Sequence, residues 1–212
     1  MQALDRIDYS NNWLTLVFLF TLLLLVVLKT SNQQKLFGYA SAFFRKGFIA
    51  KKTEERESLI NFFNIVLLCF SAIVYAIFIS LVAAHFLDIT AGFTVFMSVF
   101  GFVFIYLALF LILDVGFAKL FEVQNETSYL FSTKIAYLYT ISLILFPVLI
   151  IICYSSISIS VLLFVFMMLF LISLLLLFVN NKNLILNKLF YFILYLCALE
   201  IAPLLIIYKM MV

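Results

Sequence analysis

One acidic residue lies deep inside an apolar stretch of the sequence. Glu200 is the twelfth of the twenty residues of the run 189–208, and Pro203 follows three positions later. A carboxylate at this depth in a membrane is strongly disfavoured unless it is protonated or paired. Pro203 cannot donate a hydrogen bond to the carbonyl of Leu199, which weakens the helix beside the acid. Glu200 is therefore predicted either to anchor another helix as a protonated carboxyl, or to serve proton transfer or ligand binding.

Polar side chains on other apolar segments are candidate partners for this acid. Asn61 and Asn64 are one helical turn apart, so a helix over this segment places them on one face. Residues of this kind within a membrane mostly hold helices together through hydrogen bonds. The predicted polar partners are Asn61, Asn64, Tyr75, Tyr106, Tyr137 and Thr140.

The composition shows what must position these residues. Of the 212 residues, 67% are hydrophobic and 11% are charged, and the mean hydropathy is +1.28. A globular domain is about half apolar and about a quarter charged. Apolar runs of about 20 residues with almost no charge are typical of transmembrane helices. The composition therefore excludes an ordinary soluble domain.

The apolar runs predict an all-α, polytopic membrane protein that forms a single integral membrane domain over 1–212. The segment 114–131 has apolar residues at helical spacing and predicts a separate surface helix. A basic interfacial loop over 29–57 joins the first two spans. About six spans are predicted, at residues 13–28, 58–84, 93–113, 135–154, 160–179 and 189–208.

The distribution of basic residues predicts the orientation in the membrane. Seven Lys and Arg residues lie in the loop 29–57, and four more fall in the later loops on the same side, against only Arg6 and Lys209 on the other. Cytoplasmic loops carry the excess of Lys and Arg. Both termini are therefore predicted on the non-cytoplasmic side.

The basic loop contains a second candidate site. Within 36–50, Phe37, Phe44 and Phe48 recur beside basic residues, a pattern typical of an amphipathic segment in the membrane interface. One interpretation is a cytoplasmic loop that only follows the topology rule; the other is a site for a specific lipid or partner. The membrane-surface basic residues are Arg45, Lys46, Lys51 and Lys52.

Motifs for enzymatic chemistry are missing from the sequence. The single histidine, His85, excludes sites that need two histidines, and the three cysteines form no CxxC pair. There is no GxSxG motif and no phosphate-binding glycine loop. We therefore expect no enzymatic activity, no cofactor, no metal site and no nucleic-acid partner.

The closing segment LFYFILYLCALEIAPLLIIYK (189–209) resembles the end of an uncharacterised family of polytopic inner-membrane proteins of Bacteroidota, a domain of unknown function ending in LYLC-x-LE-x-x-P. The resemblance implies a Gram-negative inner membrane, in a lineage whose envelope machinery includes type IX secretion and gliding. The positions that correspond to the family motif are Tyr195, Leu196, Cys197, Leu199, Glu200 and Pro203.

Taken together, these features favour a non-enzymatic inner-membrane protein that is an accessory or assembly subunit of a larger envelope complex. Its expected partners are the lipid bilayer and other membrane-protein subunits, or further copies of itself. The alternative is a small proton-coupled transporter or channel that uses Glu200. An enzyme acting on a lipid has the least support.

Overall fold

The structure is a computed structural model that describes residues 12–43, 61–86, 92–120, 124–155 and 158–180; from 110 through 132 it describes the backbone alone. Within these ranges the chain is all-helical and contains no strand, which confirms the predicted fold class. The helices are α1 (Asn12–Ser31), α2 (Gln33–Ala40), α4 (Phe62–Phe86), α5 (Phe93–Leu120), α6 (Gln124–Tyr154) and α7 (Ile159–Asn180).

Four of these helices are long and apolar enough to cross a membrane. They are Trp13–Ser31 in α1, Phe62–Phe86 in α4, Thr133–Tyr154 in α6 and Ile159–Asn180 in α7. A helix of 22 residues is about 33 Å long, close to the roughly 30 Å of a bilayer core. In α5 the apolar part with described side chains is Phe93–Leu109. This architecture is that of a helical integral membrane protein.

The first five predicted spans each correspond to one of these helices, whereas the sixth, 189–208, lies outside the described residues. The prediction of a separate surface helix over 114–131 is wrong, because α5 continues to Leu120 and α6 already begins at Gln124. Once a helix has started, each further residue adds a hydrogen bond, so it extends past the end of an apolar run. The predicted location of the termini stays a prediction.

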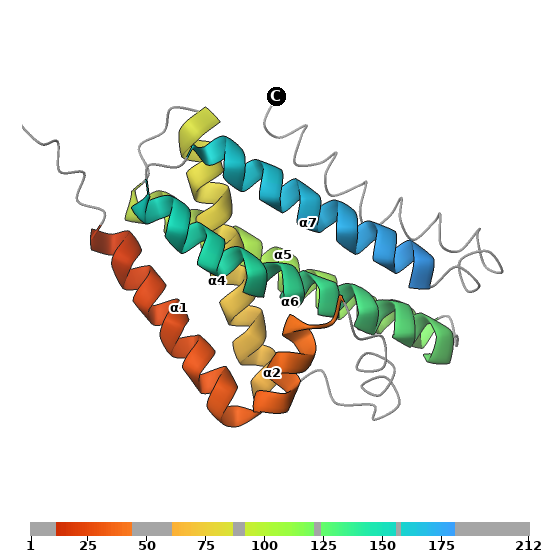
Figure 1. Cartoon of the computed structure of the whole chain (residues 1–212). Coiled ribbons are helices and arrows are strands. Elements are labelled where there is room, and N and C mark those ends of the chain that lie inside the picture. Colours follow the sequence, from red (N-terminus) through yellow and green to blue (C-terminus); the bar gives the residue numbers. More distant parts are fainter. Residues whose placement is uncertain (1–11, 44–60, 87–91, 121–123, 156–157, 181–212) are drawn as a thin grey trace, which may run out of the picture.

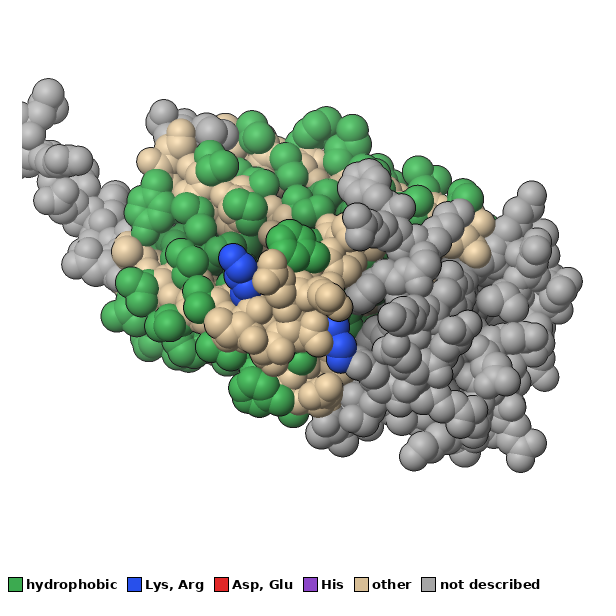
Figure 2. Space-filling view, turned by 60° about the horizontal axis from the view of Figure 1, so that its bottom comes forward, with side chains coloured by type: hydrophobic (Ala, Val, Ile, Leu, Met, Phe, Trp, Pro, Cys, Tyr) green, Lys and Arg blue, Asp and Glu red, His purple; other side chains and the backbone are tan. Residues whose placement is uncertain are grey.

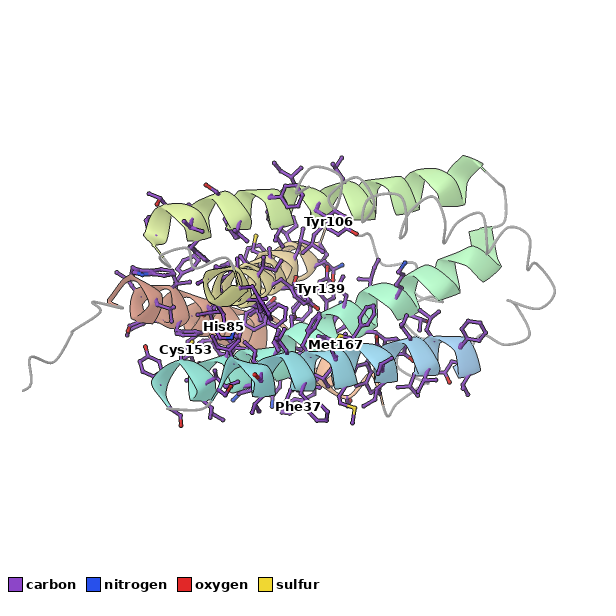
Figure 3. All side chains as sticks on the ribbon, turned by 90° about the horizontal axis from the view of Figure 1, so that it is seen from above. Phe37, His85, Tyr106, Tyr139, Cys153 and Met167 are labelled. Atoms are coloured by element: carbon purple, nitrogen blue, oxygen red, sulfur yellow. The ribbon has the colours of Figure 1, made fainter. Side chains whose placement is uncertain are left out.

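The helices α4 and α6 form the centre of the bundle. Figure 1 shows α1 along one edge, with α2 folded back toward the lower part of α4 and the middle of α6. Viewed from above, α5 and α7 lie on opposite sides of this centre (Figure 3). In the spanning windows of α4 and α6, 61% of the residues are buried, compared with 11% in α7. The outermost helix α7 thus presents most of its surface outward.

Aromatic rings fill the centre of the bundle. Phe146 of α6 lies between Phe70 of α4, at 5.5 Å between ring centroids, and Phe18 of α1, at 6.2 Å. Farther along, Phe78 of α4 contacts Phe166 of α7 at 4.4 Å. Edge-to-face and tilted pairs at these distances stabilise packing beyond the burial of the rings themselves. These contacts fix α1 and α7 against the central pair.

Most of the described buried serine and threonine hydroxyl groups bond to the backbone of their own helix. Thr21, Ser71, Ser80, Ser142 and Ser173 each donate to a carbonyl three or four residues earlier in the same helix, at 2.8–3.0 Å. Such bonds satisfy a polar side chain without a second helix. The hydroxyl groups that instead reach another helix therefore mark specific contacts.

Candidate functional site

A sharp turn at Asn32 directs α2 back into the bundle. Asn32 N donates to the Leu28 carbonyl at the end of α1, at 3.1 Å, and its side-chain Oδ1 accepts from Lys35 N at 3.0 Å. An asparagine with extended backbone that accepts from the third residue of the next helix is a typical N-cap. One residue thus ends one helix and begins the next, and α2 buries Leu36 and Tyr39.

Among the side chains that the structure describes, Tyr39 is the largest that is fully buried, and it fits between two helices. Its ring stacks on Phe63 of α4, with centroids 6.2 Å apart, and meets Tyr139 of α6 edge-to-face at 5.5 Å. The backbone of Tyr39 is also held, because Thr140 Oγ1 lies 2.7 Å from its carbonyl oxygen. The same hydroxyl lies 2.8 Å from the Ala136 carbonyl, and its one proton can be donated to either acceptor.

A second interhelical contact lies one turn earlier in α6. Asn180, the last residue of α7, donates from Nδ2 to the Tyr137 hydroxyl oxygen at 2.8 Å. The Tyr137 ring also packs against Phe43, just after α2, with 5.3 Å between centroids. Asn180 Oδ1 is buried and has no hydrogen-bond partner among the described atoms. Tyr137 therefore connects the end of α7 to the segment after α2.

The third contact joins the two central helices. The Tyr75 hydroxyl of α4 donates to the Leu138 carbonyl of α6 at 2.8 Å. With Tyr137 and Thr140, this places three interhelical contacts within four consecutive residues of α6. We refer to Tyr39, Tyr75, Tyr137, Thr140 and Asn180 as the polar junction. It contains three of the six partners predicted from the sequence, Tyr75, Tyr137 and Thr140.

The structure places the other three predicted partners in α4, just before it, and in α5. Asn64 is buried in the first turn of α4. Asn61 is exposed and precedes α4, where its carbonyl accepts from Ile65 N at 3.0 Å. Tyr106 is 37% exposed on α5, and Figure 3 shows it on the outer helix, away from Tyr139 at the centre.

The remaining candidates lie outside the described residues. They are the acid and its motif neighbours, Tyr195, Cys197, Leu199, Glu200 and Pro203, and the basic residues Arg45, Lys46, Lys51 and Lys52. Their predicted roles stay predictions.

Two members of the polar junction, Tyr39 and Asn180, were missed by the sequence analysis. Tyr39 falls in the loop predicted to lie in the membrane interface, and Asn180 falls at the edge of an apolar run. The only local signal was a polar side chain next to apolar residues with a helical period. Both residues are identified only by their contacts with α6, which is distant from them in the sequence.

The chemistry of the polar junction is that of hydrogen bonding between neutral groups. Its members are phenol, hydroxyl and amide side chains with backbone carbonyls. Among the side chains that the structure describes, no group of three or more His, Cys, Asp or Glu residues could hold a metal ion. Interhelical hydrogen bonds in membranes fix which helices pair and at what rotation. The junction accordingly sets how α2, α4 and α7 sit on α6.

At the opposite end of the bundle, aromatic side chains hold α1 against α5 and α6. Trp13 lies 5.6 Å from Phe96 and 6.3 Å from Phe93 between ring centroids. The Tyr154 hydroxyl donates to Thr15 Oγ1 at 2.7 Å. Trp13, Phe93 and Tyr154 are exposed or half-buried, as expected for aromatic residues near a membrane surface, whereas Phe96 is buried.

Comparison with known proteins agrees with this architecture. The family described as "Domain of unknown function (DUF4271)" matches residues 14–211, almost the whole chain. A comparison with curated proteins and with solved structures finds no match. The match covers α1 through α7 together with the segment of the predicted sixth span. The chain therefore belongs to the DUF4271 family, which confirms the expected membership of a family of unknown function.

Proposed function

We propose that the protein is a non-enzymatic subunit or assembly factor of a larger complex in the bacterial inner membrane. The observation that supports this proposal best is the surface of α7. Only 11% of its spanning window is buried, and its outward residues are large and apolar. Such a surface is suited to lipid and equally to the helix of a partner.

The residues of α7 that pack against the bundle determine which of its residues face outward. Leu162, Phe166, Ser173 and Asn180 follow each other at helical spacing and face the bundle. Phe164, Met168, Leu171 and Leu175 lie on the outer side, each 48–64% exposed. A defined, rigid row of large side chains is what a partner helix can pack against. We call these four residues the α7 outer row.

The polar junction supports the same proposal. The Tyr75 and Tyr137 hydroxyl groups bond to neighbouring helices, and the Thr140 hydroxyl lies within bonding distance of α2, which is the structural role expected of polar groups in a membrane bundle. A location in the inner membrane and a relation to envelope machinery rest on the resemblance of the closing segment. They are part of the proposal.

The test is a pulldown of the tagged full-length protein from its native membrane in mild detergent, after crosslinking in cells. The decisive variant replaces Phe164, Leu171 and Leu175 of the α7 outer row by alanine. Its matched control replaces three exposed residues of α1 by alanine: Leu16, Phe20 and Leu23. Both variants stay apolar, so both should insert into the membrane.

A partner recovered in constant proportion with the wild type and the α1 control, but lost with the α7 variant, would support the proposal. A wild-type protein that is always recovered alone would refute it. In that case the alternative, proton-coupled transport through Glu200, becomes the working hypothesis. It requires a pH-dependent flux that is lost in Glu200→Gln.

A further inference from the structure

The corner between α1 and α2 carries a run of polar and basic residues. The apolar part of α1 ends at Leu28, and Lys29 is exposed. The residues that follow, 30–34, are Thr, Ser, Asn, Gln and Gln, and Lys35 lies in the first turn of α2. We refer to residues 29–35 as the basic corner. Figure 2 shows two lysine patches separated by backbone and by side chains that are neither charged nor hydrophobic, with hydrophobic side chains nearby.

The apolar residues around the basic corner are of the kind expected at the depth of lipid headgroups. Leu28 and Leu36 on either side are buried, whereas Phe37 in α2 and Phe62 at the start of α4 are 60% and 63% exposed. Figure 3 shows Phe37 at the edge of the molecule, away from the central Tyr139. An exposed aromatic ring beside a lysine is typical of a helix lying in the interface between headgroups and acyl chains.

The charged residues within the basic corner itself have one sign. No acidic side chain occurs between residues 13 and 43, and both charged residues of the corner, Lys29 and Lys35, are basic. Basic residues beside a membrane attract anionic lipids by electrostatic attraction. The turn at Asn32 holds the two lysines at the ends of two packed helices, so the charge is presented at a fixed place.

From these observations we infer that the basic corner binds the headgroups of anionic phospholipids in preference to zwitterionic ones. It acts as an anchor that keeps α2 in the interface while Tyr39 is inserted between α4 and α6. The inference requires a membrane location but does not depend on a protein partner at α7. Its failure would therefore leave the pulldown above unaffected.

The experiment uses the full-length protein reconstituted in vesicles, with one tryptophan as a local reporter. The chain has a single tryptophan, Trp13, at the opposite end of α1. In the reporter protein, Trp13→Phe is combined with Phe37→Trp, which moves the fluorophore to the basic corner. Quenching by brominated phosphatidylglycerol, compared with brominated phosphatidylcholine, gives the relative affinity of each lipid at the reporter.

We expect a clear preference for phosphatidylglycerol at position 37 and none at position 13. Each lysine near an anionic surface contributes about fivefold in affinity, so Lys29→Gln with Lys35→Gln should lower the preference by up to about 25-fold at low salt. The matched control, Lys29→Arg with Lys35→Arg, should retain it. Salt near 0.5 M should reduce the preference of the parent reporter, because exposed charges are screened.

Equal preferences at positions 13 and 37, or a preference at 37 that neither the glutamine variant nor salt reduces, would overturn the inference. If the glutamine variant does not fold, the salt series on the parent reporter and on the arginine variant is used instead. A preference at position 37 that salt does not reduce in either protein would overturn the inference. Inorganic phosphate is added as a further competitor. A loss of lipid preference beyond that caused by chloride at equal ionic strength would mean that the corner binds free phosphate, and would overturn the assignment to lipid.

Discussion

The contact between Thr140 and the Tyr39 carbonyl yields the sharpest test of the polar junction. Thr140→Val removes the hydroxyl and nearly preserves the shape of a side chain that is fully buried. The bond at 2.7 Å joins α6 directly to the backbone of α2. The Tyr39 carbonyl also accepts from the Ala42 amide at 3.2 Å, a local bond that does not reach α6.

The expected magnitude follows from how the hydroxyl proton is shared. Hydrogen bonds between membrane helices contribute about 0.6 kcal/mol on average and at most about 1.7 kcal/mol. Thr140 Oγ1 can also donate to Ala136 of its own helix, a bond that contributes nothing to holding α2. Thr140→Val should therefore lower the free energy of unfolding by about 1 kcal/mol. The loss in stability should increase with the fraction of time that the hydroxyl donates to the Tyr39 carbonyl and not to the Ala136 carbonyl.

The matched control is Ser142→Ala. Ser142 is fully buried two residues away on the same helix, but its hydroxyl donates to the Tyr139 carbonyl within α6. Removing it should change the stability by no more than a few tenths of a kcal/mol, because no second helix loses a contact. Thr140→Ser keeps the hydroxyl and should restore most of the stability lost in Thr140→Val.

Unfolding by sodium dodecyl sulfate in mixed micelles measures the global effect, and hydrogen exchange of the amides over 36–42 measures the local one. We expect faster exchange over these residues in Thr140→Val and no change in Ser142→Ala. If Thr140→Val matches Ser142→Ala in stability and leaves the exchange over 36–42 unchanged, the hydroxyl bonds to Ala136, and the proposed hold on α2 is refuted.

Three further predictions use the same unfolding assay. Tyr39→Ala should cost about 4 kcal/mol because it empties a fully buried aromatic site, whereas Phe37→Ala, at an exposed position of the same helix, should cost less than about 1 kcal/mol. Equal effects of these two changes would contradict the burial of Tyr39. Tyr137→Phe should cost about 2 kcal/mol because it leaves the half-buried Asn180 amide without its acceptor. A combined Asn180→Leu change should recover part of that loss, and an unchanged loss would argue against the bond. Tyr75→Phe should cost about 1 kcal/mol. No loss would show that the bond from Tyr75 to α6 does not stabilise the bundle.

The spanning helices were predictable from the sequence because apolar length alone determines which segments can cross a membrane. The boundaries were less predictable. The helix expected from residue 58 begins at Phe62, so Asn61 precedes α4 instead of sharing a face with Asn64. The polar segment 114–131 continues two helices with only residues 121–123 between them, because helix extension does not require apolar side chains.

The position of α2 could not be predicted from local pattern. The spacing of Phe37 and Phe44 favoured a helix lying on the membrane surface, whereas the side chain that enters the bundle is Tyr39. Its acceptor carbonyl and the donor hydroxyl of Thr140 are 101 residues apart. Hydropathy describes how each residue interacts with lipid and water. It contains no information on which distant hydroxyl group donates a hydrogen bond to a given backbone carbonyl.

The rotation of α7 illustrates the same limit and explains why its exposed face is informative. An almost uniformly apolar helix has no preferred side toward lipid, so burial of apolar area alone cannot fix its rotation. Two specific contacts do so, the Asn180 hydrogen bond to Tyr137 at one end and the Phe166 contact with Phe78 nearer the other. Because both contacts hold the same side of α7 against the bundle, the α7 outer row has a fixed direction. A row of large apolar side chains with a fixed direction is a surface that a partner helix can pack against, which is why the proposed subunit role rests on α7.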